Sequence, residues 1–164
     1  MTPETSTEDQ RAFAVAALVP DPEVPCINVD ELGILRWVRV ENGVATAGVS
    51  PTYSGCPAVQ MIEEEITKAL QSAGYEARIE RVLSPPWTTD WISDVGREKL
   101  RVYGISPPEK TAHKISALFG ETRVNCPKCG SDNTEKLSEF GSTACKAHYR
   151  CKACSEPFDH FKCI

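Results

Sequence analysis

The sequence has little that would place the protein in a membrane or on nucleic acid. Its uninterrupted apolar runs are far too short to cross a bilayer, and residues 1–30 lack the basic start and apolar centre of a signal peptide. A basic stripe of the kind that binds nucleic acid is also missing. Residues 121–164 have a net charge of +1 and residues 1–120 a net charge of -6, which gives -5 for the chain. We therefore expect a cytoplasmic protein that binds neither nucleic acid nor membrane.

A recognisable catalytic apparatus is absent as well. The sequence has no glycine-rich phosphate loop and no nucleophile elbow, and its three histidines all lie after residue 110. A Cys-His hydrolase would have to bring one of these histidines to Cys56, and nothing in the sequence indicates this. The expectation is a protein that is not an enzyme.

Hydrophobic periodicity predicts three helices and three strands before residue 105. They are a helix in "STEDQRAFAVAALVP" that ends at Pro20, a hairpin over Ile34–Ser50 that turns at Asn42-Gly43, a helix from Pro57 to Gly74, a strand in "YEARIERVL", and a helix from about Ser93 to Gly104. This order predicts an α+β fold with helices packed on one face of a small sheet. The expected parts are a disordered tail at 1–10, this domain at 11–105, a tether at 106–124, and a small four-cysteine ribbon at 125–164.

Eight cysteines are many for a chain of 18.0 kDa, and six of them fall in the last 39 residues. A disulfide framework is disfavoured without a secretion signal, and clustered thiols in a reducing compartment indicate metal. Two C-x2-C pairs stand 21 residues apart, and "CPKCG" has the Pro and Gly of a tight metal-binding turn. The sequence predicts a structural zinc site at Cys126, Cys129, Cys151 and Cys154, with a thiolate-bound iron-sulfur cluster as the alternative.

Two further cysteines each stand three positions from a histidine. Cys145 with His148, and His160 with Cys163, could compose a second metal site. Alternatively, both cysteines are small buried residues and the histidines lie on the surface, which is the interpretation that we favour.

A cysteine between a glycine and a proline opens the central helix, in the stretch "VSPTYSGCPAVQMIEEEI". With Pro57 as the first helical residue, Cys56 becomes the N-cap. Its sulfur would lie near unpaired amides and the positive end of the helix dipole, which lower the pKa of a thiol and favour the thiolate. A cysteine that merely packs under the sheet is the alternative.

Other segments could share the surface around Cys56. The stretch "DPEVP" places acids on a rigid connector, and "PPWTTDWIS" offers aromatic anchors for a partner if the loop is exposed. If the loop is not exposed, its tryptophans close the core, and Thr89 or Asp90 can equally be helix caps. The proposed supporting surface comprises Asp21, Glu23, Thr52, Ser54, Trp87, Thr88, Thr89, Asp90 and Trp91.

Several motifs together resemble one protein family over nearly the whole chain. They are "DPEVP", "LGI", "PTYSGCPA", "VLSPPWTTDWIS", "GREKLRVYGISPP" and the cysteine-rich tail from "CPKCGSDN" to "DHFKC". These stretches resemble those of PaaD (also called PaaJ), the phenylacetate-degradation proteins of bacteria. Residues 11–105 resemble the domain shared by SufT-like proteins and the eukaryotic cytosolic iron-sulfur targeting factor, and the tail distinguishes the PaaD family within that group.

The resemblance implies a role in maturation. PaaD-type proteins are linked to the multicomponent phenylacetyl-CoA epoxidase, which has a di-iron oxygenase and a reductase with flavin and an iron-sulfur cluster. The related domain acts in iron-sulfur maturation, and its signature cysteine matches Cys56. We therefore expect an accessory protein that assists assembly through Cys56, with a transient iron-sulfur cluster as cargo. The implied partners are the oxygenase or reductase and the iron-sulfur assembly machinery, and a homodimer is also implied.

Two other functions stay open on the sequence alone. The protein could be a structural or electron-transfer subunit of the oxygenase complex, with a redox-active cluster in its tail. It could also be a thiol-dependent enzyme whose turnover requires Cys56.

Overall fold

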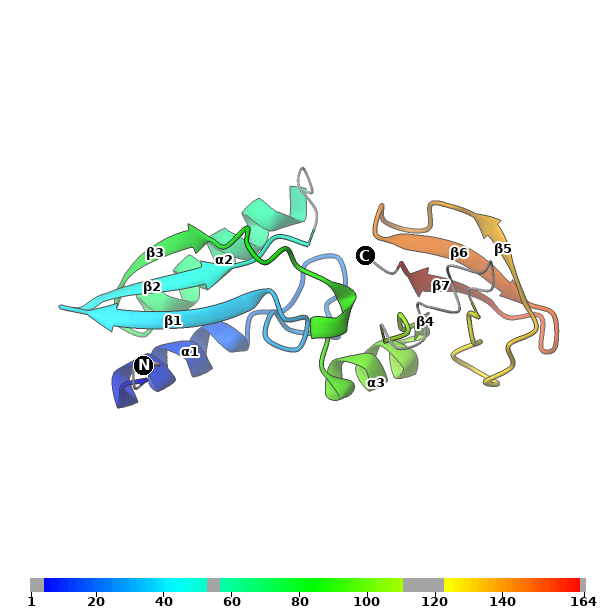
Figure 1. The fold of residues 1–164 in the computed structure, drawn as a ribbon, viewed down its shortest axis with the longest axis horizontal. Helices are drawn as coiled ribbons and strands as arrows, with labels where there is room; N and C mark the ends of the chain where they lie inside the picture. The colour runs from blue at the N-terminus through cyan, green and yellow to red at the C-terminus, as the bar shows by residue number, and fades with distance from the viewer. Residues whose placement is uncertain (1–4, 53–56, 111–122, 163–164) are drawn as a thin grey trace. The chain divides into compact units, whose positions relative to one another are not determined.

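The structure is a computed structural model that describes residues 5–52, 57–110 and 123–162. The chain divides into two compact units, Met1–Trp87 and Thr88–Ile164 (Figure 1). Within the described ranges, no helix has the length and apolar character needed to span a membrane.

The first unit is built on a three-stranded sheet with strand order β1-β2-β3. Strands β1 (Leu35–Glu41) and β2 (Val44–Val49) form an antiparallel hairpin, and β3 (Glu76–Arg81) pairs parallel to β2. The hairpin turns at Asn42-Gly43, whose φ angles of 51° and 80° suit the two-residue turn that matches strand twist. The parallel pairing requires a crossover, which helix α2 (Pro57–Ser72) supplies.

Both helices of this unit cover the same face of the sheet (Figure 1). Helix α1 (Thr7–Ala17) packs on β1 and β2, α2 packs on β2 and β3, and the two helices contact each other. Helix α1 begins with a capping box between Ser6 and Asp9. Helix α2 buries a stripe with helical spacing, made of Ala58, Ile62, Ile66 and Leu70. The predicted α+β fold with helices on one face of a small sheet is confirmed.

The opposite face of the sheet carries mostly polar and charged side chains. Arg39, Thr46 and Arg78 share one cross-strand row. The Trp37 indole lies over Gly48, where an added Cβ would overlap the ring, and the Arg39 guanidinium stacks on the same ring, 4.6 Å from its centroid. Glycine is therefore required at position 48 by the close approach of Trp37.

The second unit holds a four-stranded sheet with strand order β4-β7-β6-β5. Strands β5 (Thr134–Ser138), β6 (Lys146–Cys151) and β7 (Pro157–Phe161) are antiparallel, and β4 (Ile105–Ser106) pairs parallel to β7. A buried cluster on this sheet is formed by Val124, Cys126, Ala147, Tyr149, Cys151 and Phe158. Two of the four predicted metal-binding cysteines thus belong to the core of this unit.

Helix α3 (Asp94–Tyr103) lies in the second unit, whereas the sequence assigned it to the domain at 11–105. The helix begins after the N-cap Ser93 and ends at Gly104, directly before β4, and β4 pairs with β7 of the cysteine-rich region. Arg101 of α3 also donates to the carbonyl of Pro127, 3.4 Å away. The expected boundary followed the composition of the tether, from which a two-residue strand cannot be recognised.

Candidate functional site

Three of the sequence-predicted site residues lie outside the described residues. They are Ser54, Cys56 and Cys163. The placement of the proposed thiol at Cys56 and of one ligand in the proposed second metal site therefore stays a prediction.

The structure describes the residues that flank positions 53–56. The buried Ser50 follows β2, and its hydroxyl donates to the carbonyl of Val82, 3.0 Å away, which links the carboxyl ends of β2 and β3. Helix α2 is described from Pro57 onward and has no acidic residue in its first turn. The first turn of this sixteen-residue helix thus supplies no carboxylate that would offset the positive end of the helix dipole.

The acidic connector places Asp21 in a structural role. Asp21 is buried, and its Oδ1 accepts hydrogen bonds from the N–H groups of Glu23 and Val24, each at 2.8 Å. The carboxylate thus closes a turn of the type that Asp favours. Glu23 and Thr52 are half-buried.

Most residues of the tryptophan-containing loop are buried or half-buried. Trp87 is 5% exposed, and its indole N–H donates to the carbonyl of Leu32 at 2.9 Å, so it closes the core of the first unit. Thr88 caps the short 3-10 helix η1 (Thr89–Trp91) by accepting from the Asp90 N–H. Thr89 is buried, while Asp90 and Trp91 are half-buried.

The four sequence-predicted cysteines of the tail come together in the structure. The sulfurs of Cys126, Cys129, Cys151 and Cys154 all lie within 4.8 Å of one another. The Cys126 and Cys154 sulfurs are 3.8 Å apart, and those of Cys129 and Cys151 are 3.5 Å apart. A tetrahedral ion with bonds of about 2.3 Å to sulfur separates its ligands by roughly 3.8 Å. These residues fit a four-coordinate metal ion.

Each C-x2-C pair contributes one buried and one exposed cysteine. Cys126 and Cys151 are buried, while Cys129 and Cys154 are exposed. The backbone N–H groups of Cys154 and Ala153 lower the pKa of Cys151 to about 7. The N–H of Glu156 favours the thiolate of Cys154, but partial loss of solvent around the sulfur and its hydrogen bonds with the three neighbouring sulfurs outweigh it and raise the pKa of Cys154 to about 12. A cation bound between the sulfurs would lower the pKa of all four cysteines, because its charge favours their thiolates.

The structure does not bring together the described residues of the proposed second metal site. His148 pairs with Asp159 across β6 and β7, whereas His160 pairs with Ala147, so the two histidines point to opposite faces of the sheet. His160 is buried, with its Nδ1 3.1 Å from the carbonyl of Ser106, and burial lowers its pKa to about 4. The Cys145 sulfur lies 3.0 Å from the Thr143 hydroxyl.

Two side chains that make several hydrogen bonds in the second unit, Asp159 and Arg97, were not anticipated from the sequence. The Asp159 carboxylate accepts a hydrogen bond from the Ser142 hydroxyl at 2.7 Å and lies 3.1 Å from His148 Nδ1. Burial alone would raise the pKa of Asp159, but these hydrogen bonds outweigh burial, and the pKa is lowered. Arg97 of α3 donates to the carbonyls of Thr89 and Ile92, at 2.7 and 3.3 Å. The sequence signal for Asp159 is the Gly141-Ser142 pair, because a Cβ at Gly141 would lie 2.6 Å from the Asp159 carboxylate. No comparable signal marks Arg97.

Two family models match separate parts of the chain. Residues 12–83 match the model described as iron-sulfur cluster assembly protein, and residues 110–162 match the PaaD zinc beta ribbon domain. A solved structure of a DUF59 domain from Bacillus anthracis is also similar, with a TM-score of 0.52 and 26% identity. It covers 56% of this chain, and 90% of that chain is matched.

Two relatives connect these parts to named proteins. The chain is 32% identical to the Fe-S protein maturation auxiliary factor SufT of Staphylococcus aureus (strain USA300), over 52% of this chain and 99% of the relative. It is 45% identical, over 93% of this chain and 91% of the relative, to a protein of Escherichia coli (strain K12) that is named as one of the subunits of 1,2-phenylacetyl-CoA epoxidase. Both parts and nearly the full length of that relative are present, and the chain therefore belongs to the PaaD family.

Proposed function

We propose that the protein is a non-catalytic accessory factor of the phenylacetyl-CoA epoxidase, and that it assists assembly of an iron-sulfur or di-iron centre through Cys56. The names of two relatives support this role, because one is named as a subunit of that epoxidase and the other as a maturation factor. Iron, a cluster or a client's cluster ligand would be held transiently, as cargo. The partners would be the oxygenase or reductase and the iron-sulfur assembly machinery, in the cytoplasm.

The observation that supports this proposal is that Pro57, the residue directly after Cys56 in the sequence, lies in the first described turn of α2. A sixteen-residue helix with no acid in its first turn offers unpaired amides and a positive dipole end, which favour a thiolate at the preceding residue. A single thiolate leaves its cargo incompletely ligated and can therefore release it. The position also falls within residues 12–83, which match the iron-sulfur cluster assembly model.

The four-cysteine cluster would be the permanent metal site, and we propose zinc as its ion. The match to a zinc beta ribbon supports this choice, as do the short distances between the sulfurs. A cluster spreads its thiolate ligands over two or four irons, so its sulfurs lie farther apart than those around a single ion. The role of this ion is to fold the second unit.

The test replaces Cys56 with serine and compares it with Cys26→Ser, a matched control at a half-buried cysteine in the same unit. We expect Cys56→Ser to retain the fold and the zinc content, and to abolish maturation of the epoxidase in a strain that depends on this protein. Cys26→Ser should support normal epoxidase activity. Unchanged epoxidase activity with Cys56→Ser would contradict the proposal.

A second candidate function is a structural or electron-transfer subunit of the oxygenase complex, favoured by the name of the Escherichia coli relative. In that case the protein would co-purify with the oxygenase at a fixed ratio. Its tail would also contain iron and acid-labile sulfide, with a visible colour and an EPR signal after reduction. Zinc without sulfide, together with no stable association, would exclude this second function.

A further inference from the structure

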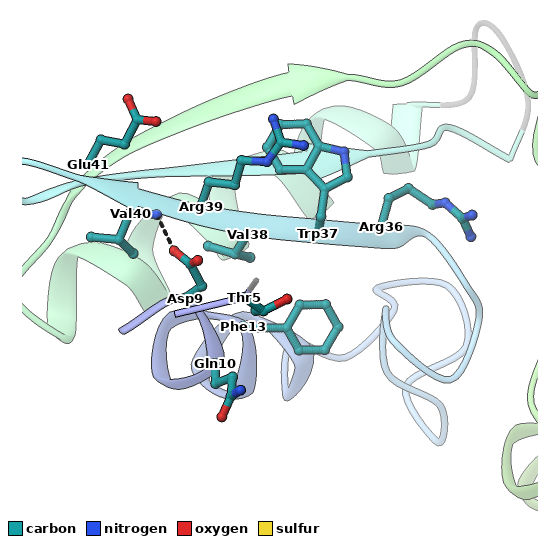
Figure 2. A pocket seen from close by; sticks show the side chains of 10 residues that line it. All are labelled: Thr5, Asp9, Gln10, Phe13, Arg36, Trp37, Val38, Arg39, Val40 and Glu41. Carbon is teal, nitrogen blue, oxygen red and sulfur yellow. Dashed lines mark hydrogen bonds between the residues drawn. The ribbon is translucent and has the colours of Figure 1, made fainter. Parts of the chain in front are cut away.

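A groove follows the free edge of the sheet in the first unit (Figure 2). Strand β1 is an edge strand, because the strand order is β1-β2-β3. The groove has a volume of about 680 Å³ and lies between this edge and the first turns of α1. Its lining comprises Thr5, Asp9, Gln10 and Phe13, together with residues 36–41 of β1.

The backbone of β1 presents hydrogen-bonding groups to this groove. The N–H of Val40 donates to Asp9 Oδ1 at 2.7 Å, so it points away from β2. Because N–H directions alternate along a strand, the N–H and C=O of Val38 point into the groove as well. No partner is found for these two groups among the residues that the structure describes. An unpaired strand edge is a template for another extended chain.

The two sides of the groove differ in chemistry. Figure 2 shows Trp37 and Arg39 on one side of β1, and Phe13 and Asp9 on the other. An added strand would place alternate side chains beside these two walls. Side chains on the α1 side would contact the Phe13 ring, and those on the open side would lie beside the Arg39 guanidinium.

Beside the stretch of β1 that is open for pairing, the charge on the open side is that of Arg39. Glu41 lies on the same side of β1, but beyond the Asp9–Val40 bond that ends this stretch. The guanidinium of Arg39 stacks on Trp37 and makes no ion pair with a described carboxylate, so its charge is available. The Asp9 carboxylate interacts with the charge of Arg39 without forming a hydrogen bond to it, because its two oxygens already accept from the N–H groups of Val40 and Ser6, at 2.7 and 2.9 Å. A carboxylate on the occupant could therefore form a charge-assisted pair with Arg39.

We propose that the β1 edge binds a short extended segment of a partner protein in which apolar and acidic residues alternate. The segment adds beside β1, exchanges two hydrogen bonds with Val38, and places an acidic side chain on Arg39 and an apolar one on Phe13. The paired stretch is short, because a bulge between Leu35 and Trp37 limits it at one end and the Asp9 bond at the other. This binding involves neither Cys56 nor the metal site, so it stands apart from the function proposed above.

The first test leaves the protein unchanged and varies the backbone of the ligand. The probe is a fluorescein-labelled hexapeptide of three Val-Glu repeats, compared with two versions that are N-methylated at every valine or at every glutamate. We expect the unmodified peptide to bind and one methylated version to bind at least about tenfold more weakly, or about 1.4 kcal/mol. Amide exchange at Val38 should slow when the unmodified peptide is bound. Equal binding of all three peptides, or binding of none, would overturn the proposal.

The second test varies the walls of the groove. Arg39→Glu should weaken binding of the Val-Glu peptide at least about fivefold and improve binding of a Val-Lys peptide, because the charge pair is reversed. Arg78→Glu is the matched control, since Arg78 is exposed on the same sheet face but on β3, away from the groove. If Arg39→Glu and Arg78→Glu act alike, the groove is not the binding site. Self-association of the wild type that Arg39→Glu abolishes would instead make a second copy the occupant and refute a partner segment.

Discussion

The two units of the chain are stabilised by different means. The first unit encloses fully buried aliphatic side chains from its helices, strands and connector, among them Ile27, Leu32, Ile66 and Leu70. The second unit has a small buried cluster of six residues. Two of them are cysteines, and their sulfurs lie close to the sulfurs of two further cysteines. We therefore expect the first unit to fold without a ligand, and the second unit to depend on a cation between its thiolates.

The largest effect that we predict separates the two units through the metal. Cys151→Ser removes a buried ligand, so the protein should lose its metal and the tertiary order of β5, β6 and β7, while the first unit stays folded. Metal binding contributes about 10 kcal/mol or more in small zinc modules. Metal analysis and amide NMR spectra measure both effects, with Cys145→Ser as a control that keeps the metal. Retention of the metal by Cys151→Ser would contradict this assignment.

The next prediction acts on the first unit alone. Leu70→Ala opens a cavity at a fully buried position of α2 and should destabilise this unit by about 2–5 kcal/mol in urea unfolding, with no change in metal content. Met61→Ala on the exposed side of α2 is the control and should cost less than about 0.5 kcal/mol. Metal loss in Leu70→Ala would show that the two units are energetically coupled.

A pH dependence should distinguish the second unit at a smaller scale. The pKa of His160 falls from the ordinary 6.5 to about 4 because burial disfavours its charged form. The free energy of unfolding that neutral His160 contributes is therefore fully present above pH 6.5 and is lost as the pH falls towards 4. The loss is about 1.4 kcal/mol per pH unit and at most about 3 kcal/mol. Thiolate protonation also releases metal in acid, so the measurement is the difference between wild type and His160→Gln. Identical pH profiles would contradict this role for His160.

The smallest predicted effect concerns the link between α1 and β1 in the first unit. The Val40 N–H lowers the pKa of Asp9, so the carboxylate stabilises the fold above the ordinary pKa of 3.8 and ceases to do so as the pH falls through its lower folded value. Asp9→Asn weakens both the helix cap and this link, at a cost of about 1 kcal/mol at neutral pH. Thermal unfolding tests this, with the exposed neighbour Glu8→Gln as the control. Equal losses in the two variants would argue against a special role for Asp9.

Local signals in the sequence were sufficient for the elements of the first unit. The Asn42-Gly43 pair is one of few dipeptides that favour two successive positive φ angles, and the apolar spacing from Ile62 to Leu70 is that of a helix with one buried face. The four tail cysteines were equally predictable, because knuckle spacing and metal geometry are directly related.

Long-range contacts explain what the sequence could not provide. Trp87 could equally have been an exposed anchor, since its bond to the Leu32 carbonyl joins residues 55 positions apart. The assignment of α3 depends on the pairing of β4 with β7, and periodicity carries no information on such partners. The separation of His148 from His160 follows from strand alternation in β6 and β7, which sequence spacing alone did not locate.

The alternation of buried and exposed sulfurs has a kinetic consequence. Cys129 and Cys154 are exposed residues, whereas Cys126 and Cys151 are buried, so we expect a chelator or a competing thiol to reach the metal from the side of Cys129 and Cys154. We then expect release of the ion by direct attack of the chelator, without prior opening of the second unit. Its rate should rise with chelator concentration without reaching a plateau set by unfolding. The metal centre would thus be thermodynamically tight and kinetically accessible.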